Sequence, residues 1–405
     1  MFRTNLLLAL AALSSTVEAQ TLVGVHWDSG AIHEISTVDA SITPMGFSAP
    51  RFLGDLTLAA DGFLYGIRSG ADPELVRIDG VSGVSLVVGP LGLPSVFEGA
   101  LAISPAGIAY GFSVGTSTTP QLFQVDLATG AATGLVALSN PPHEINGAAF
   151  RSDGVLMALE RVTNSLVTID PATGAVSAMQ VLTPYLGSVG GLTTIGGTGY
   201  FVRAGPGSAG PSTLWQVDLH TGAHVLVGDL GPIGWGTGFS GLAAVPAPPG
   251  TPFCFGYGTT LTCPCGNNTS LYQRAGCAHS QSAGGVLRVG GTASVSNDTL
   301  LLRGSSMSWS SALYLQGSAT LGGGFGAHFG DGLRCAGGTI VRLGTKLNEG
   351  GRSQYPDSGD ASVSVRGTVP AGATRHYQVW YRNAAAFCTP ETFNLTNGVT
   401  VIWSN

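Results

Sequence analysis

Charged residues are scarce in this chain of 405 residues: only 10% are Asp, Glu, Lys or Arg, and the formal net charge is −6. No basic cluster occurs, so the electrostatic signature of a nucleic-acid-binding protein is missing. Beyond the N-terminal 19 residues, no long stretch places apolar residues at the helical spacing i, i+3, i+4 and i+7. These absences argue against nucleic acid and anionic membranes as partners, and against a helical fold.

The common motifs for metals and cofactors are absent as well. We find no calcium loop, HExxH helix, Walker loop or dinucleotide fingerprint. The histidines are scattered, and the two that lie four residues apart, His220 and His224, flank a Thr-Gly turn. We therefore expect neither a bound metal nor a cofactor.

Residues 1–19 have the pattern of a secretory signal peptide. Arg3 precedes an apolar run at 6–13, and Val17-Glu18-Ala19 forms a small-residue cleavage site. The run is too short to span a bilayer, which takes ~20 residues, and no later stretch matches it. We expect a secreted or cell-surface protein, monomeric and without a transmembrane segment.

Glycine is abundant, with 62 residues, and it separates short apolar segments rich in Val and Thr. Four such segments end in Asp and turn on Thr-Gly or Ser-Gly, at Asp79, Asp126, Asp170 and Asp218. The repeat length is close to the ~40 to 50 residues of a β-propeller blade. The sequence therefore predicts an all-β fold that begins with a β-propeller.

The repeated residues are interpreted as turn formers. Each Asp is expected to hydrogen-bond the backbone of its own turn, which is a structural role, not a catalytic one. A positive φ favours glycine in the turn between the first and second strand of a blade. We assign four glycines to it: Gly62, Gly107, Gly154 and Gly199.

Counting strands predicts a five-bladed β-propeller over residues 20–246. The first strand, 21–26, has no inner neighbour before it, and the last, 241–245, has no partner after it. We expect these two strands to pair in a composite blade, because this closes the ring and removes its open edges.

A Pro-rich linker at 247–252 leads into a second domain at 253–405. Short segments of alternating polarity in this domain predict a β-sandwich. They are 286–289, 299–302, 312–315, 339–343, 362–365, 376–381 and 399–403.

All six cysteines lie in the second domain: Cys254, Cys263, Cys265, Cys277, Cys335 and Cys388. An exported chain with an even number of cysteines favours three disulfides, whose pairing the sequence leaves open. A zinc site at Cys263, Cys265 and Cys277 is the alternative, but the single residue between the first two is shorter than the usual spacer. We expect a disulfide-stapled β-sandwich domain.

The cysteine motifs of the second domain resemble a known module. Cys254-Phe255-Gly256, Cys263-Pro264-Cys265-Gly266 and Phe387-Cys388-Thr389-Pro390 are similar to the Cys-rich C-terminal module of many secreted proteins of environmental Gram-negative bacteria. The resemblance covers residues 253–405 and implies a role in attachment, display or binding. The propeller half resembles secreted propellers with Asp-x-x-Thr-Gly repeats.

Blade-specific charges gather in the loops expected at one mouth of the propeller channel, where ligand sites tend to form. Nearby aromatic rings are suited to stacking on sugars. We predict an exported binding or surface-interaction protein that recognises extracellular glycan or another cell-surface component at this mouth. The predicted ligand-binding residues are His26, Trp27, Arg68, Glu98, Glu144, Glu160, Arg161, Arg203 and Trp235.

Two other interpretations stay open. The same charges can pair with one another and only stiffen the ring. Alternatively, Glu98, Glu144 and Glu160 supply the two carboxylates of glycoside hydrolysis, which makes a secreted hydrolase the alternative function. A G-x-S-x-G pentapeptide at 111–115 has the form of a hydrolase nucleophile elbow, but the required strand-turn-helix context is absent around Ser113.

Overall fold

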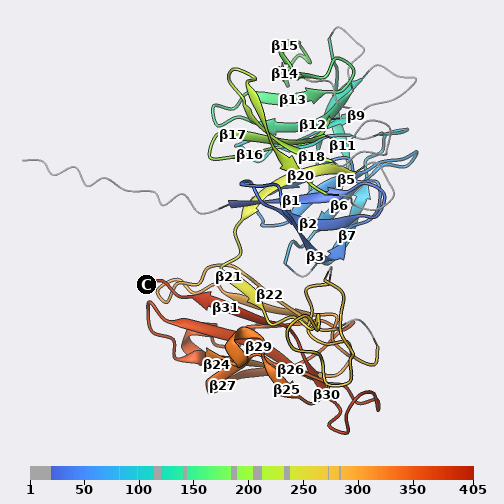
Figure 1. Ribbon diagram of the computed structural model, residues 1–405. Coiled ribbons are helices and arrows are strands. Elements are labelled where there is room, and N and C mark those ends of the chain that lie inside the picture. Colours follow the sequence, from blue (N-terminus) through green and yellow to red (C-terminus); the bar gives the residue numbers. More distant parts are fainter. Residues whose placement is uncertain are drawn as a thin grey trace, which may run out of the picture.

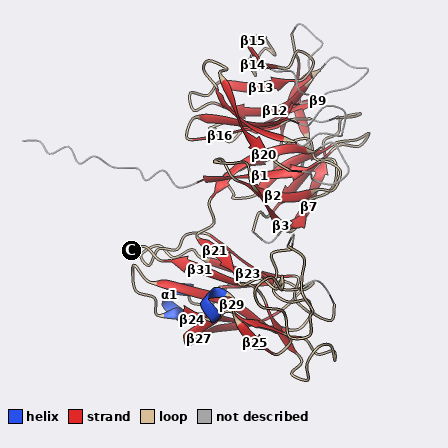
Figure 2. Ribbon diagram, in the orientation of Figure 1, coloured by secondary structure: helices blue, strands red, loops and turns tan. Residues whose placement is uncertain are grey.

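The computed structural model describes residues 20–81, 83–97, 99–113, 120–139, 144–183, 189–203, 212–231, 238–271, 273–281 and 284–405. The signal-peptide prediction at 1–19 lies outside these ranges. Strands dominate the described chain, so the all-β prediction is confirmed (Figure 2). In the part that the structure describes, no helix has the length and apolar character needed to cross a membrane.

The described residues of the N-terminal part form five four-stranded antiparallel sheets (Figure 1). The first sheet consists of β20 (Phe239–Pro246), β1 (Gln20–His26), β2 (Ala31–Ile35) and β3 (Ile42–Ser48). The second consists of β4 (Thr57–Leu58), β5 (Leu64–Arg68), β6 (Glu74–Ile78) and β7 (Ser85–Pro90). The third consists of β8 (Leu101–Ile103), β9 (Ala109–Ser113), β10 (Gln121–Val125) and β11 (Ala132–Ala137). The fourth consists of β12 (Ile145–Phe150), β13 (Leu156–Glu160), β14 (Ser165–Ile169) and β15 (Val176–Val181). The fifth consists of β16 (Val189–Ile195), β17 (Thr198–Arg203), β18 (Thr213–Asp218) and β19 (His224–Asp229).

The sheets are arranged around a common axis. Their innermost strands β20, β4, β8, β12 and β16 contact one another in this order, and β16 contacts β20 in turn. In the first sheet β1 pairs with β20, from Gln20 opposite Pro246 to His26 opposite Phe239. The predicted composite blade is confirmed. This pairing joins the two ends of the propeller and leaves neither strand as an open inner edge.

The repeated Asp residues organise their turns as predicted. One carboxylate oxygen of Asp126 accepts the N–H of Ala128 at 2.8 Å, and the other accepts the Thr129 hydroxyl at 2.7 Å. These two hydrogen bonds, the backbone one first, lower the pKa of Asp126. Asp170 makes the same two contacts within its own turn. The Asx role is confirmed.

The assignment of Gly199 to a turn is wrong. Gly62, Gly107 and Gly154 do adopt φ values of 81° to 86° between the first and second strands of their sheets. In the fifth sheet Gly196 and Gly197 take this turn, and Gly199 lies inside β17. A Cβ at Gly199 would come within 2.7 Å of the side chains of β18 and the residues after it, so glycine is needed there for packing.

The C-terminal part contains a larger and a smaller sheet. The larger has the order β21 (Gly250–Phe253), β31 (Gly398–Ile402), β29 (Thr374–Arg382), β24 (Ser311–Thr320) and β27 (Ala336–Leu347), with β30 (Phe393–Leu395) also paired to β29. The smaller consists of β22 (Val286–Gly290), β23 (Leu301–Ser305) and β28 (Ser353–Tyr355). β25 (Ala327–Phe329) and β26 (Gly332–Arg334) form a separate hairpin. The two helices are the 3₁₀ turn η2 (Gly322–Gly324) and α1 (Val363–Gly367), counted over the described residues.

Residues from both sheets form one buried core. Leu302 of β23, Tyr314 of β24, Val379 of β29 and Val401 of β31 belong to it, and Trp403 fills its centre with 1% of its surface exposed. The predicted β-sandwich is therefore confirmed. Alternate residues are the more buried ones in β23 and in the first part of β24, which is the reason the polarity of these segments alternates.

One predicted strand of the sandwich is wrong. Residues 362–365 were expected to form a strand from their alternating polarity, but α1 begins at Val363. The N–H of Ser364 donates to the Asp298 carboxylate at 2.6 Å, so a residue 66 positions away caps the start of this helix. Local sequence gives no sign of such a partner.

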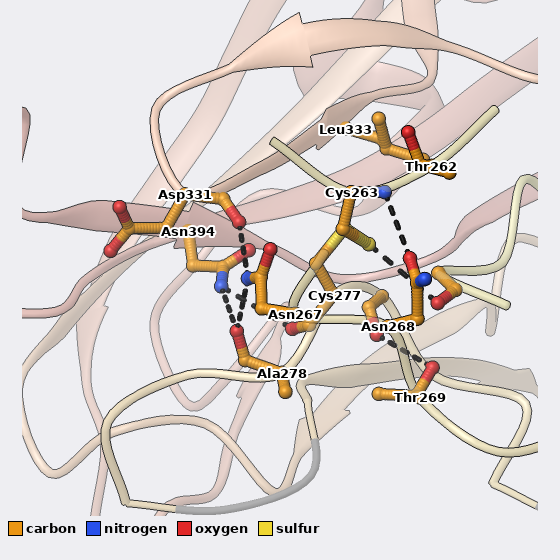
Figure 3. The surroundings of a disulfide bond; sticks show 12 residues. Thr262, Cys263, Asn267, Asn268, Thr269, Cys277, Ala278, Asp331, Leu333 and Asn394 are labelled. Carbon is orange, nitrogen blue, oxygen red and sulfur yellow. Dashed lines mark hydrogen bonds between the residues drawn. A yellow bond between two sulfur atoms is a disulfide. The ribbon is translucent and has the colours of Figure 1, made fainter. Parts of the chain in front are cut away.

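All six cysteines form disulfides, and the zinc alternative is thereby excluded. The pairs are Cys254–Cys335, Cys263–Cys277 and Cys265–Cys388. Amide side chains reinforce the region around them (Figure 3). Asn267 donates to the carbonyl oxygens of Ala278 at 2.7 Å and Asp331 at 2.8 Å, and Asn394 donates to the same Ala278 oxygen at 2.9 Å.

Candidate functional site

The predicted mouth is only partly described. Residues 98, 114–119, 140–143, 184–188, 204–211 and 232–237 lie outside the described ranges, and with them Glu98 and Trp235. The other predicted site residues are placed by the structure at the ends of strands in four of the five sheets.

Two of the three candidate catalytic carboxylates already have partners. Glu160, at the end of β13, is completely buried, and its oxygens accept the N–H groups of Val162 at 2.9 Å and Thr163 at 2.7 Å. It also accepts the N–H of Glu144 at 3.2 Å, while the Glu144 carboxylate pairs with Arg161. General acid catalysis needs a carboxyl that reaches the substrate. Glu160 instead organises its own loop, and Glu144 neutralises a neighbouring arginine.

The remaining predicted charges also support the ring. Arg68, at the end of β5, pairs with Glu74 directly opposite on β6. Arg203 is buried, and burial lowers its pKa. Its guanidinium donates to the Leu182 carbonyl at 3.0 Å and lies 5.0 Å from the centre of the Trp215 ring. Arg203 therefore connects the fifth sheet to the fourth.

His26 and Ser113 are likewise engaged in local structure. The buried His26 ring lies 6.3 Å from the Phe239 ring, and its Nδ1 is 3.0 Å from the Ser29 hydroxyl. Ser113 is buried at the end of β9, where its hydroxyl accepts the N–H of Gln121 at 3.3 Å. The Ser113 hydroxyl therefore joins the end of β9 to the start of β10, and the His26 ring forms part of the packing of the first sheet.

An aromatic pair lies at the same mouth, with Trp27 partly buried and Phe52 exposed. The rings of Trp27, at the end of β1, and Phe52 lie 5.5 Å apart in an edge-to-face arrangement. Phe52 is 39% exposed, and the Arg51 guanidinium lies 5.1 Å from the centre of its ring. Backbone hydrogen bonds from Phe52 to Trp27 and from Ser69 to Phe52 bring this pair next to Arg68. We call Trp27, Arg51, Phe52 and Arg68 the aromatic rim.

Phe52 also has an unusual backbone. Its φ is 65°, in the left-handed region that costs a side chain with a Cβ about 1–2 kcal/mol. Strain of this kind is often found at functional positions. Phe52 was not among the predicted site residues, because a strained backbone leaves no sign in a single sequence.

Asp55 lies at the centre of the ring and was not among the predicted site residues. Its carboxylate accepts the N–H groups of Leu56 at 2.8 Å, just before β4, of Leu242 at 3.3 Å, in β20, and of Ala148 at 3.3 Å, in β12. Complete burial raises the pKa of Asp55 well above its usual range, and these N–H groups, with that of Leu101, oppose the rise. Asp55 therefore ties the inner strands together across the axis.

A sequence signal for Asp55 existed in the comparison between blades. The corresponding positions of the other sheets are occupied by Ala100, just before β8, and by Gly147, Gly191 and Gly241, within β12, β16 and β20. A Cβ at Gly241 would lie 2.7 Å from the backbone of Asp55, so small residues are required there. Asp55 is the single acidic residue at a position where the other sheets have Ala or Gly, which indicates that its side chain fills the space left by the small residues.

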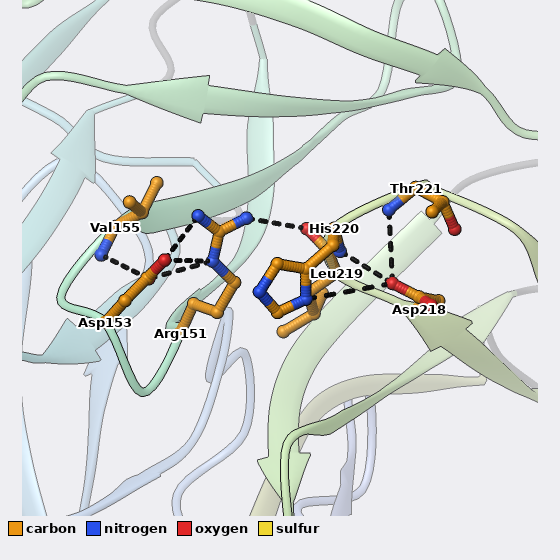
Figure 4. A network of polar contacts seen from close by, with 7 residues as sticks. All are labelled: Arg151, Asp153, Val155, Asp218, Leu219, His220 and Thr221. Carbon is orange, nitrogen blue, oxygen red and sulfur yellow. Dashed lines mark hydrogen bonds and ion pairs between the residues drawn. The ribbon is translucent and has the colours of Figure 1, made fainter.

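The opposite end of the channel opens into a cavity of about 320 Å³ lined by residues such as Leu58, Ser104, Phe150 and Thr194. Arg151 stands beside it and donates to the Asp153 carboxylate, at 2.8 Å from Nε, and to the Leu219 carbonyl at 3.2 Å (Figure 4). The hydrogen bonds from Arg151 hold the pKa of Asp153 down at about 2. The guanidinium thus links a turn of the fourth sheet to one of the fifth.

Comparison with known proteins gives few matches in sequence. A family model described as a repeat of unknown function (DUF6923) matches residues 57–226. No curated protein matches the chain.

Among solved structures, a protein of unknown function from Bacteroides caccae is 12% identical, with 56% of this chain and 99% of that chain covered and a TM-score of 0.34. Virginiamycin B lyase from Staphylococcus aureus is 14% identical over 52% of this chain and 65% of its own, with a TM-score of 0.31. A chain of a nidogen/laminin complex is 14% identical over 56% of this chain and 98% of its own, with a TM-score of 0.36. Over residues 57–226, from β4 into β19, the chain is therefore similar to a repeat family that has no assigned activity.

Proposed function

We propose that this protein is an exported binding protein that recognises extracellular glycan at the aromatic rim of its propeller. The observation that carries the proposal is the exposed Phe52, held at a positive φ beside Trp27. Aromatic faces stack on the apolar faces of sugar rings, and Arg51 and Arg68 provide donors for sugar hydroxyls.

The location of the rim is consistent with this role. The strand β5 extends from Leu64, which lines a pocket next to the C-terminal module, to Arg68 at the rim. The rim therefore lies on the face of the propeller that points away from the module. Three disulfides suit an oxidising, extracellular compartment. The module can then attach or display the propeller while the rim stays accessible.

The binding role is favoured over the hydrolase alternative. Glu160 is buried and hydrogen-bonded to the backbone of its own loop, and Glu144 is paired with Arg161. A glycosidase needs two carboxyl groups on either side of a bond. Neither Glu144 nor Glu160 is presented as an unpaired carboxyl group for this chemistry.

A glycan array with the mature protein, residues 20–405, tests the proposal, followed by calorimetric titration of the best polysaccharide. Truncating an anchoring aromatic residue removes at least about 1–2 kcal/mol of binding, so Trp27→Ala and Phe52→Ala should each weaken binding about tenfold or more. Phe325→Ala is the matched control, because Phe325 is an exposed aromatic residue of the module.

Two outcomes would contradict the proposal. One is the absence of binding to any polysaccharide, and the other is unchanged affinity in both rim variants. Turnover of a bound glycan that Glu144→Gln abolishes would favour the hydrolase instead.

A further inference from the structure

The interface between the propeller and the C-terminal module brings together three arginines and two acids. Arg274 lies 3.3 Å from the Glu34 carboxylate of β2, and Arg303 of β23 pairs with Asp79. Arg288 of β22 lies with its guanidinium 5.3 Å from the centre of the Phe47 ring. In the two ion pairs, the module supplies the positive charges and the propeller the negative ones.

Asp79 shows how the repeat is adapted to this interface. In the turns of Asp126 and Asp170, a threonine hydroxyl donates a hydrogen bond to the second carboxylate oxygen. In the turn of Asp79, one carboxylate oxygen accepts the N–H of Val81 at 2.9 Å and the other accepts a hydrogen bond from Arg303. One blade has therefore used its turn residue to bind the module.

Arg288 is the one of the three arginines that forms no ion pair with Glu34 or Asp79. Among the described residues its guanidinium makes no hydrogen bond or ion pair, since Glu34 is paired with Arg274 and Asp79 with Arg303. It also stands directly opposite Arg303 in the register of β22 and β23, where like charges repel. Burial lowers the pKa of Arg288 to about 10, and nearby Glu34 only partly opposes this. Among these five charged residues, Arg288 is therefore the one without an ion-pair partner.

Arg288 lines a pocket of about 270 Å³ between the two parts of the chain. Apolar side chains from both parts form most of its walls, including Met45, Leu64, Val245 and Val399. The charged residues of the lining are Glu34 and Arg288. Apolar walls with a small number of well-placed polar or charged groups are the usual composition of a small-molecule site.

We propose that this interdomain pocket binds a small apolar molecule with one carboxylate, which Arg288 receives while the apolar portion fills the pocket. A guanidinium binds a carboxylate through two parallel hydrogen bonds. One negative charge balances that of Arg288, whereas a doubly charged phosphate would be repelled by Glu34. Because the walls come from both parts of the chain, bound ligand would also strengthen their association.

Octanoate is a suitable probe, and n-octanol and octyl phosphate are its matched controls, titrated calorimetrically into the mature protein. Octanoate should bind at least about tenfold more tightly than n-octanol, because a hydrogen bond to a charged group is worth about 1.5–3 kcal/mol. Each methylene added between hexanoate and octanoate should tighten binding about three- to fourfold.

Two variants should change the affinity in opposite directions. Arg288→Met keeps the apolar stem and should weaken octanoate binding about tenfold while leaving n-octanol unchanged. Glu34→Gln removes the nearby negative charge and should strengthen octanoate binding severalfold. Loss of shape alone would weaken binding in both variants.

The proposal would be overturned by equal affinity for octanoate and n-octanol, by tighter binding of octyl phosphate, or by no binding of any probe. If Arg288→Met does not fold, the Glu34→Gln variant still tests the proposal, because unchanged or weaker octanoate binding in that variant would contradict it. These titrations are independent of glycan binding, because the rim lies at the other end of β5.

Discussion

At the scale of single residues, the rim combines strain with exposure. Phe52 keeps a positive φ although its ring is only partly buried, so the surrounding backbone must hold it in place. The N–H of Phe52 donates to the Trp27 carbonyl, and the Phe52 carbonyl accepts the N–H of Ser69. These two hydrogen bonds hold the loop on both sides of the ring. A ring presented in this way is preorganised, and preorganisation lowers the cost of binding.

We predict that Phe52→Gly is more stable than Phe52→Ala by about 1 kcal/mol, because glycine adopts a positive φ without the clash that a Cβ causes. Both variants lose the ring and should lose glycan binding to the same extent. Urea unfolding of the two variants measures the difference. Equal stability, or a more stable alanine variant, would show that the backbone at this position is not strained.

Single residues were the hardest part of the site to predict. Glu160 and Arg203 have the charge of ligand-binding residues, yet both are buried and bonded within the ring. A sequence shows the type of a side chain but not the direction in which it points. Asp55 is the reverse case, since its role depends on N–H groups from strands that meet only in the folded ring.

At the scale of elements, local turn chemistry was predictable where the pattern is complete. The turn at residues 36–40 has the same form as the repeated turns but lacks their Asp and Gly, so the sequence repeat does not predict it. Ser36 takes the place of Asp, and Ala40 takes the place of glycine with a φ of 57°. The N–H of Ala40 still donates to the Ser36 carbonyl at 3.1 Å, as Gly130 does to Asp126. The pairing in the ring imposes this turn without the usual residues.

The composite sheet contains a buried histidine that makes it sensitive to acid. The His33 ring of β2 lies 5.5 Å from the Phe239 ring of β20. Burial, followed by repulsion from His26, lowers the pKa of His33 from 6.5 to about 4. The unfolded chain therefore takes up a proton at His33 at a higher pH than the folded protein does.

We predict that this group stabilises the fold fully above pH 6.5 and that its contribution is lost as the pH falls from 6.5 to about 4. The loss amounts to about 3 kcal/mol at most. In His33→Gln, the fall in unfolding free energy between pH 7.0 and 4.5 should be smaller by about 2–3 kcal/mol, measured by urea unfolding. His220→Gln, at an exposed position, should behave like the parent protein. An unchanged pH dependence in His33→Gln would contradict the prediction.

At the scale of the whole molecule, the sequence predicted two β-rich parts and the location of the cysteines. It did not predict how the parts meet, because Arg303 and Asp79 are 224 positions apart and each has an ordinary role within its own part. The disulfide pairing was also beyond prediction, since it depends on which loops of the sandwich lie close together. Repeats and periodicity encode strands, whereas contacts between distant surfaces follow from the completed fold.

All three disulfides lie in the C-terminal module, so reduction should lower the stability of the module and leave that of the propeller unchanged. The bonds close loops of 81, 14 and 123 residues, and longer loops lose more entropy when they are cross-linked. Replacing Cys265 and Cys388 by serine should therefore destabilise the module more than replacing Cys263 and Cys277, with losses of about 2–5 kcal/mol.

Limited proteolysis with and without dithiothreitol, followed by mass spectrometry, measures this separation. We predict that reduction exposes the module to cleavage while a fragment covering β1 to β20 persists, because the described propeller strands depend on no disulfide. The propeller closes its own ring through the pairing of β1 with β20, so its core stays intact when the module unfolds. Degradation of both parts at the same rate would show that the interface with Arg303 and Arg274 makes the chain a single cooperative unit, and resistance of the reduced module would show that its core is sufficient without the disulfides.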